Sequence, residues 1–145
     1  MKLVLQRVAR ASVTVDGETV AKISRGILIL FGAEKNDEPG QIEFLADKTA
    51  NLRIFPDENG KMNLSCRDIQ GEILVVSQFT LAGDCSKGRR PGFDGAAPPD
   101  LAESLYHQFI QAVSGSGLRV QGGKFGADMQ VDLVNDGPVT FILER

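Results

Sequence analysis

The stretch Ile73-Leu74-Val75-Val76-Ser77-Gln78-Phe79-Thr80-Leu81 is an apolar run that ends in alternating polar and apolar side chains. Its first four residues are aliphatic and three of them are β-branched, which predicts a strand buried on both faces. Ser77, Gln78 and Thr80 predict a polar end to this strand. Backbone held by a core strand is suited to fix hydrogen-bond donors against a substrate. An ordinary strand end that enters a turn has the same pattern, so this stretch alone does not decide the function.

The composition predicts one folded domain over residues 1–145, with 42% hydrophobic and 24% charged residues. A net charge of −3 and a pI near 5.2 argue against a surface coated with positive charge for nucleic acid. No apolar run approaches the ~20 residues of a membrane helix, and Lys2 and Arg7 interrupt the N-terminal apolar residues. We therefore expect a cytoplasmic protein without a membrane partner. Cys66 and Cys85 lack C-x-x-C spacing, which predicts free thiols and no metal site.

Short alternating and apolar runs predict the other strands. Alternation over residues 11–15, the turn Asp16-Gly17 and a return over residues 19–23 predict a hairpin. The apolar run 27–31 predicts a central strand, and the three strands together predict an antiparallel meander. Further strands are expected at 53–55, 62–65, 118–121, 129–133 and 139–143, with a compact turn or hairpin at Asn135-Asp136-Gly137-Pro138.

Two helices complete an α+β fold class. Asp37 as a cap and Pro39 in the first turn predict a helix that packs one apolar face on the sheet. Asp100 and Glu103 resemble a capping box at the start of a second helix, which ends near Gly115.

A polar, glycine-rich loop over residues 83–95 separates the central strand from the second helix and carries Lys87, Arg89 and Arg90. This loop is either a phosphate-contacting element or a solvated connection. His107, the only histidine, lies off the apolar stripe of its helix. We therefore expect a surface histidine and no Ser-His or Cys-His nucleophile pair.

Three motifs taken together resemble the signatures of the D-aminoacyl-tRNA deacylases. They are Ser77-Gln78-Phe79-Thr80-Leu81, Lys87-Gly88-Arg89-Arg90-Pro91 and Asn135-Asp136-Gly137-Pro138-Val139-Thr140. Weaker matches follow the same order and spacing, at Gln6-Arg7-Val8, Ala11-Ser12-Val13-Thr14-Val15, Gly60-Lys61-Met62-Asn63 and Phe125-Gly126-Ala127-Asp128-Met129-Gln130-Val131. The resemblance spans the whole chain and departs from the family at Gly92, where serine is expected.

The resemblance implies a hydrolase for the ester that joins a D-amino acid, or glycine, to the 3′ end of tRNA, with no cofactor and no metal. It implies a compact, barrel-like and largely antiparallel sheet with two helices outside, and a homodimer with the active site at the interface. Residues 77–81 of one subunit would meet Gly137-Pro138 of the other. That peptide bond would be cis, and its backbone would occupy the space that an L side chain needs.

The resemblance also implies roles for single residues. Arg7 resembles the residue that braces the Gly-Pro turn, and its alternative is a surface salt bridge. Phe125 and Met129 resemble residues lining a pocket for the terminal adenosine, and their alternative is plain core. Lys87, Arg89 and Arg90 would contact tRNA phosphates.

The catalytic residues implied are Ser77, Gln78, Phe79 and Thr80. Backbone amides near Phe79 and Thr80 would stabilise the oxyanion. We favour water as the nucleophile, aided by the ribose 2′-OH and oriented by Thr80, over a covalent acyl-Thr80 intermediate, because no side-chain base is evident.

Two other function classes compete with an editing esterase. One is a non-catalytic single-strand nucleic-acid module. Such modules display several exposed aromatic rings, whereas this chain has no Trp, a single Tyr at position 106, and Phe residues expected mostly on core faces. The other is a hydrolase of free D-amino-acid esters, which has no need of the basic loop.

Overall fold

The apolar run from Ile73 forms β6, Glu72–Ser77, inside a six-stranded sheet. The computed structural model describes all residues 1–145. β6 lies parallel to both its neighbours, β3 (Gly26–Gly32) and β7 (Arg119–Gly122). The predicted strand is confirmed, but it ends at Ser77 and does not continue to Leu81. The chain turns there because the Gln78 amide bonds to the Phe31 carbonyl at 2.7 Å and residues Phe79–Ala82 form a 3-10 helix, η1.

The long strand β1, Lys2–Val15, organises the rest of the sheet. One of its edges pairs antiparallel with β3 along the first half and with β2 (Glu18–Ile23) along the second half. Its other edge pairs antiparallel with β8, Gln130–Glu144, over almost its full length. The expected meander is therefore wrong in its order, since β1 and not β2 is the shared neighbour.

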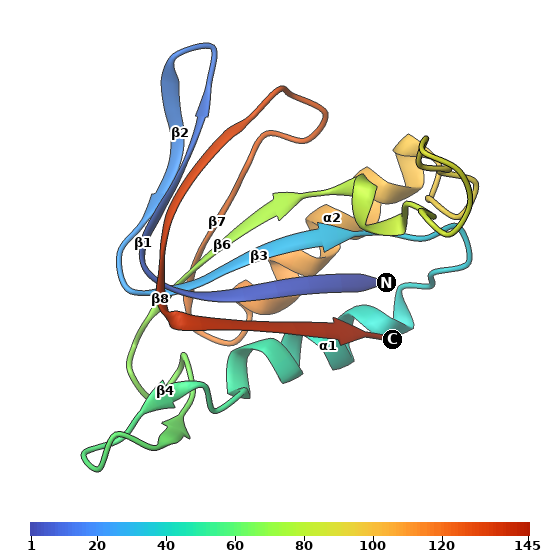
Figure 1. Cartoon of the computed structure of the whole chain (residues 1–145). Helices are drawn as coiled ribbons and strands as arrows, with labels where there is room; N and C mark the ends of the chain where they lie inside the picture. The colour runs from blue at the N-terminus through green and yellow to red at the C-terminus, as the bar shows by residue number, and fades with distance from the viewer.

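The sheet curls into a barrel-like layer with the helices on its outside (Figure 1). α1 is Gly40–Asn51 and α2 is Pro99–Ser114. A separate two-stranded hairpin of β4 (Phe55–Pro56) and β5 (Met62–Leu64) projects from one end. The predicted fold class is confirmed: an α+β, largely antiparallel, barrel-like sheet with two helices. The parallel pairings of β6 were not predicted.

β3 and β6 are buried on both faces because they separate two hydrophobic cores. Side chains at odd positions, such as Ile29 and Val75, face the core shared with the helices. Side chains at even positions, such as Leu28 and Leu74, face the inside of the barrel. This arrangement explains why both strands are continuously apolar rather than alternating.

Neither helix is capped as predicted. The N-cap positions are Pro39 and Pro98, and neither has a side-chain cap hydrogen bond. The Asp37 carboxylate instead accepts a hydrogen bond from the Glu34 amide at 2.7 Å. The apolar faces of both helices are nevertheless buried as expected. They contribute Ile42, Leu45 and Ala46 from α1, and Leu105, Phe109 and Val113 from α2.

Both cysteines are free, as predicted, with Cys66 buried and Cys85 exposed. None of the helices is long and apolar enough to span a membrane. No three His, Cys, Asp or Glu side chains are grouped so that they could hold a metal ion.

Candidate functional site

A pocket of about 460 Å³ opens where β3 and β6 end, beside the first turn of α2. Ten of its 14 lining residues are hydrophobic, and none carries a side chain that titrates near neutral pH. The lining is formed by Phe31, Ala33, Val76, Ser77, Gln78, Phe79, Ala97, Pro99, Ala102, Phe125, Gly126, Ala127, Met129 and Val131. A largely apolar pocket with a few polar groups at one edge is typical of a small-molecule site.

The 3-10 helix η1 forms the polar edge of this pocket. The Gln78 amide bonds to Phe31, and the Leu81 amide bonds to the Gln78 carbonyl at 3.1 Å. The intervening amides of Phe79 and Thr80 stand at the start of η1, where N–H groups have no intrahelical partner. They also donate to no backbone carbonyl outside the helices and strands. Phe79 lines the pocket, whereas Thr80 follows it in the chain and is not among the lining residues. Two adjacent donors without a partner therefore lie beside the pocket, and an oxyanion requires such a pair.

Gly32 allows η1 to fold closely over the end of β3. A Cβ at this position would lie 2.7 Å from the Leu81 Cβ and 3.1 Å from the Gln78 carbonyl oxygen. Both are closer than a normal carbon contact of about 3.5–4.0 Å. The position of the two free amides thus depends on a glycine that the sequence analysis did not single out.

The Thr80 hydroxyl is exposed and accepts a hydrogen bond from the Gln78 side-chain amide at 2.6 Å. A donor directed at the hydroxyl oxygen orients this group but does not remove its proton. His107 is exposed on α2, 3.8 Å from Glu103, and does not line the pocket. The expected surface position of the histidine is confirmed, and no side chain is placed to act as a base for Thr80.

Tyr106 contacts the pocket-lining Phe125 without lining the pocket itself, and the sequence analysis missed it. Its hydroxyl lies 2.8 Å from the Val75 carbonyl and 3.1 Å from the Gly123 carbonyl, and its ring lies 5.8 Å from that of Phe125. Burial raises the pKa of Tyr106 to about 12, so the phenol stays a donor at neutral pH. A tyrosine at helical spacing beside Leu105 and Phe109 gives no sequence signal that distinguishes it from ordinary core.

Phe125 and Met129 form part of the wall of the pocket. The Gly122-Gly123 pair lets this wall approach the sheet: an added Cβ on Gly123 would lie 2.8 Å from the Met129 sulfur. Both Phe125 and Met129 are partly buried. They therefore share one pocket with Ser77, Gln78 and Phe79.

Lys87, Arg89 and Arg90 lie in an exposed loop that follows η1. Asp84 and Gly92 close the loop with two antiparallel backbone hydrogen bonds of 2.8 and 2.9 Å. Hydrogen bonding from the Ser86 side chain, and from the Ser86 amide at 2.8 Å, lowers the pKa of the Asp84 carboxylate. The loop is thus a short closed tip, and none of its three cations forms a salt bridge.

The turn at residues 135–138 is a bulge within β8 and not a hairpin. Thr140 pairs with Gln6 and Asn135 pairs with Val8, so the four residues between them oppose Arg7 alone. The Asn135 side chain closes the bulge by accepting from the Val139 amide at 2.9 Å and donating to the Thr140 hydroxyl at 3.0 Å. The Gly137-Pro138 peptide bond is cis, as the resemblance implied.

Arg7 is buried beneath this bulge. Its guanidinium donates to the Asp136 carbonyl at 2.9 Å and to the Ile54 carbonyl at 2.7 Å, and its Nε lies 3.4 Å from the Asp136 carboxylate. Two main-chain acceptors and 9% exposure distinguish this contact from a surface ion pair. Gly137 packs directly on Arg7, because a Cβ there would lie 2.9 Å from the guanidinium.

The bulge and the pocket lie apart in one chain. Ser77 pairs with Phe31, and Phe31 pairs in turn with Leu3 of β1. The bulge opposes Arg7, which lies four residues further along β1. That separation is roughly 13 Å along the strands, and β8 is on the far side of β1 from β6. In Figure 1, β8 bends at the end of the molecule opposite the loop that follows β6.

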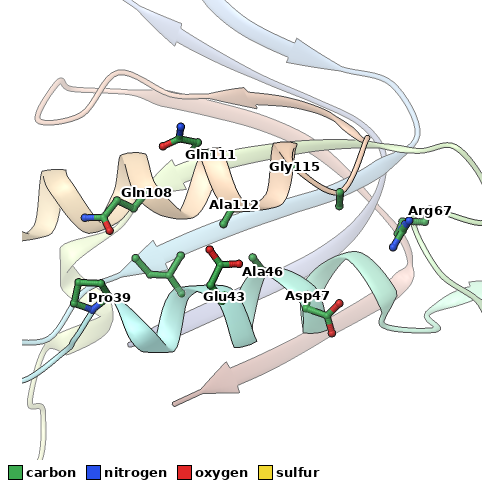
Figure 2. A pocket seen from close by; sticks show the side chains of 11 residues that line it. Pro39, Glu43, Ala46, Asp47, Arg67, Gln108, Gln111, Ala112 and Gly115 are labelled. Carbon is green, nitrogen blue, oxygen red and sulfur yellow. The ribbon is translucent and has the colours of Figure 1, made fainter.

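The largest hollow, about 600 Å³, is a different feature (Figure 2). It is an open groove between α1 and α2, into which the side chains of Glu43 and Gln108 project. Only three of its 11 lining residues are hydrophobic, and none of them belongs to the motifs that the sequence analysis singled out. The chemistry of the chain is concentrated at the smaller pocket.

Comparison with known proteins gives a consistent result. Residues 4–144 match the family model described as D-Tyr-tRNA(Tyr) deacylase. Proteins named D-aminoacyl-tRNA deacylase are similar along their whole length. That of Pelobacter propionicus is 59% identical over 145 residues, covering 100% of both chains. That of Thermosipho africanus is 58% identical over 144 residues, covering 99% of this chain and 97% of its own.

Two solved structures share the fold. A protein named c-Myc DNA Unwinding Element Binding Protein superposes with a TM-score of 0.94 at 47% identity, covering 100% of this chain and 99% of its own. A structure described as a probable eukaryotic D-amino acid tRNA deacylase has a TM-score of 0.84 at 18% identity, covering 98% and 97%. At that identity the second likeness concerns the fold alone.

Proposed function

Because the chain belongs to the D-Tyr-tRNA(Tyr) deacylase family, we propose that it hydrolyses the ester between a D-amino acid and the 3′-terminal ribose of tRNA. Family membership makes it an enzyme, a hydrolase that acts on aminoacyl-tRNA esters. The observation that carries the proposed mechanism is the pair of free amides, of Phe79 and Thr80, at the edge of an apolar pocket without titratable side chains.

The two amides stabilise the negative charge that develops on the ester carbonyl oxygen. Preorganised backbone donors of this kind contribute roughly 3–4 kcal/mol each to a transition state. η1 holds them rigidly through the hydrogen bonds at Gln78 and Leu81 and the close contact with Gly32. Ser77, at the end of β6, lines the pocket beside them and contacts the substrate.

Water is the nucleophile in this proposal, and the vicinal 2′-OH of the substrate ribose assists its deprotonation. Gln78 donates to the Thr80 hydroxyl, which leaves the Thr80 proton free to point outward and orient the water. The alternative is an acyl-Thr80 intermediate, which requires a base for Thr80. Thr80→Ala distinguishes the two: we expect a fall in kcat of about 10-fold or less, whereas a covalent mechanism predicts complete loss.

The Phe125 and Met129 wall binds the terminal adenosine in this proposal. The pocket volume of about 460 Å³ and its mostly apolar lining suit a nucleoside. Phe125 is held by its contact with the anchored Tyr106 ring, and Met129 lies against Gly123. The basic residues Lys87, Arg89 and Arg90 neutralise phosphates nearer the body of the tRNA.

Discrimination against L-aminoacyl esters requires a second copy of the chain. We place the Gly137-Pro138 bulge of one subunit over the pocket of the other, where it fills the space of an L side chain. Two features support a homodimer. The bulge is held rigidly from below by Arg7, but it does not line the pocket of its own chain. In addition, β8 is an edge strand that pairs only with β1, and its Phe141 and Ile142 are 38% and 66% exposed, a surface that proteins normally cover.

Exclusion by backbone has a further consequence for substrates. An exclusion site rejects a side chain and not an amino acid as such, so glycine is not rejected. We therefore propose glycyl-tRNA as an additional substrate.

The test is hydrolysis of matched D-tyrosyl-tRNA and L-tyrosyl-tRNA in the presence of a chelator. We expect release from the D ester alone. Release from both would contradict the exclusion mechanism. Binding of tRNA without release from either would overturn the enzyme assignment and favour the nucleic-acid-binding module.

A further inference from the structure

Two phenyl rings are exposed at the mouth of the pocket. Phe79 is 58% exposed and Phe93 is 39% exposed, and their ring centroids lie 5.1 Å apart in a tilted arrangement. The expectation that the Phe residues fall mostly on core faces is therefore wrong, since Phe44 and Phe141 are exposed as well. Large apolar side chains exposed together, rather than singly, indicate a binding surface.

Phe93 is held in this position by the backbone around it. It packs on Gly83, where an added Cβ would lie 3.1 Å from the phenyl ring. Gly92, which is hydrogen-bonded to Asp84, directly precedes Phe93, and the Phe93 carbonyl accepts from the Ala96 amide at 3.0 Å. The ring is thus exposed although its backbone is fixed on both sides. An aromatic platform of this kind loses little conformational freedom when a ligand stacks on it.

The location of the ring pair identifies the ligand. Phe79 lines the pocket, and Phe93 stands at the foot of the closed loop that carries Lys87, Arg89 and Arg90. A ligand that extends from the pocket towards the loop therefore passes over an aromatic surface and then reaches three unpaired cations. Single-stranded nucleic acid matches this order, because its bases stack on aromatic rings while its phosphates contact cations.

We propose that Phe93, together with Phe79, is the stacking platform for the unpaired nucleobase that precedes the terminal adenosine of the tRNA. This inference rests on the proposed function and extends it by one nucleotide. It assigns to Phe93 the role of a binding residue for the nucleic-acid part of the substrate, separate from the reacting ester. It also gives the enzyme a means to prefer a tRNA end over a free amino-acid ester.

The decisive measurement uses D-tyrosyl-tRNA that either carries the penultimate base or is abasic at that nucleotide. Stacking on an aromatic side chain changes binding by about 5- to 150-fold per base. Because Phe79 remains, we expect Phe93→Leu to lower kcat/KM for the normal tRNA about 10-fold, chiefly through KM. The ratio of wild-type to Phe93→Leu kcat/KM should fall to near 1 on the abasic tRNA. Phe93→Tyr, which keeps the ring, should restore the wild-type value.

Phe44→Leu is the matched control, since Phe44 is a similarly exposed phenyl ring at 46%, on α1 away from the pocket. A direct readout places 2-aminopurine at the penultimate position of a non-reactive RNA hairpin. We expect its fluorescence to be quenched by the wild type and by Phe44→Leu, and less by Phe93→Leu. Equal losses on normal and abasic tRNA, or unchanged quenching with Phe93→Leu, would overturn the inference alone. A wild type that releases no D-tyrosine from either tRNA would instead contradict the proposed function.

Discussion

Replacing Gly32 by alanine tests whether the two free amides of η1 carry the chemistry. The added Cβ would meet the Leu81 Cβ at 2.7 Å and the Gln78 carbonyl oxygen at 3.1 Å. Restoring a carbon contact of about 3.5–4.0 Å requires a shift of roughly 1 Å. Neither contact is the flexible end of a long side chain, so the shift falls on η1. The amides of Phe79 and Thr80 lie between the two contacts and move with it.

The expected effect is impaired catalysis in a protein that stays folded. A 1 Å misplacement of catalytic groups lowers the rate about 100-fold, and we expect kcat for Gly32→Ala to fall by about 10- to 100-fold. Overpacking of this kind destabilises a protein by about 1–3 kcal/mol. That corresponds to a fall in Tm of roughly 2–12 °C for a chain of this size. The protein should therefore remain folded while its catalysis is impaired.

The assay is single-turnover hydrolysis of D-tyrosyl-tRNA with enzyme in excess, which separates the chemical step from product release. Gly40→Ala is the control, because an added Cβ there meets nothing within 4 Å. Circular dichroism and thermal unfolding establish that both variants are folded. A folded Gly32→Ala protein with the rate constant of the wild type would refute the assignment of the oxyanion donors to η1.

Three further predictions concern the basic loop, the β8 edge and the buried tyrosine. Replacing Lys87, Arg89 and Arg90 by alanine should weaken tRNA binding and reduce the slope of log K against log salt by about 2; an unchanged slope in binding titrations would argue for a solvated loop. Ile142→Glu places a charge on the exposed edge strand, and light scattering should detect a monomer that hydrolyses the L ester as well as the D ester; an intact dimer would contradict the proposed interface. The pKa of Tyr106 is near 10 in the unfolded chain and about 12 in the folded protein. The contribution of the neutral phenol to the free energy of unfolding is therefore complete below pH 10 and is lost as the pH rises towards 12. In unfolding titrations, the free energy of unfolding of Tyr106→Phe should fall less steeply with alkaline pH than that of the wild type.

The sequence predicted the elements of the fold better than their connections. The apolar runs at 27–31 and 73–76 are both strands, since burial on both faces leaves a pattern that residue types reveal. The pairing of β1 with both β2 and β3 is not encoded locally. It depends on a 14-residue strand whose first half, through Leu3 and Leu5, faces one core and whose second half, through Val13, faces the other.

The bulge in β8 illustrates the same limit. Asn135-Asp136-Gly137-Pro138 has the composition of a turn, and a turn between two apolar runs is compatible with either a hairpin or a bulge. Whether a hairpin or a bulge forms depends on whether β1 can pair with both apolar runs. Gln6 and Val8 pair on either side of Arg7, so both halves of β8 continue along the same strand. Arg7, which braces the bulge, is remote in sequence, and only the resemblance assigned it this role.

The candidate site was predictable where one short segment supplies it, and less so where several segments meet. Ser77, Gln78 and Thr80 were identified from their own pattern. Ser77 and Gln78 share a pocket with Phe125 and Met129, whereas Thr80 does not line it. Tyr106, Gly32 and the Phe79–Phe93 ring pair were not identified, because their importance lies in contacts across the fold. A supporting glycine or tyrosine has the same appearance in sequence as any other turn or core residue.

The absence of a side-chain base from the pocket lining is consistent with the proposed substrate. An aminoacyl ester is activated and carries a vicinal hydroxyl, so two fixed amide donors and an oriented water are sufficient help. Such a site is reactive towards any ester that fits, and selectivity must then come from what the site excludes and from what it holds outside the reacting centre. In our proposals the Gly137-Pro138 bulge of a second subunit provides the exclusion, and the Phe79–Phe93 platform with the basic loop holds the tRNA end. Catalysis and selectivity are thereby assigned to separate groups, so the Gly32 and Phe93 variants should be impaired in different ways. Gly32→Ala should lower kcat on every substrate. Phe93→Leu should raise KM, and only when the penultimate base is present.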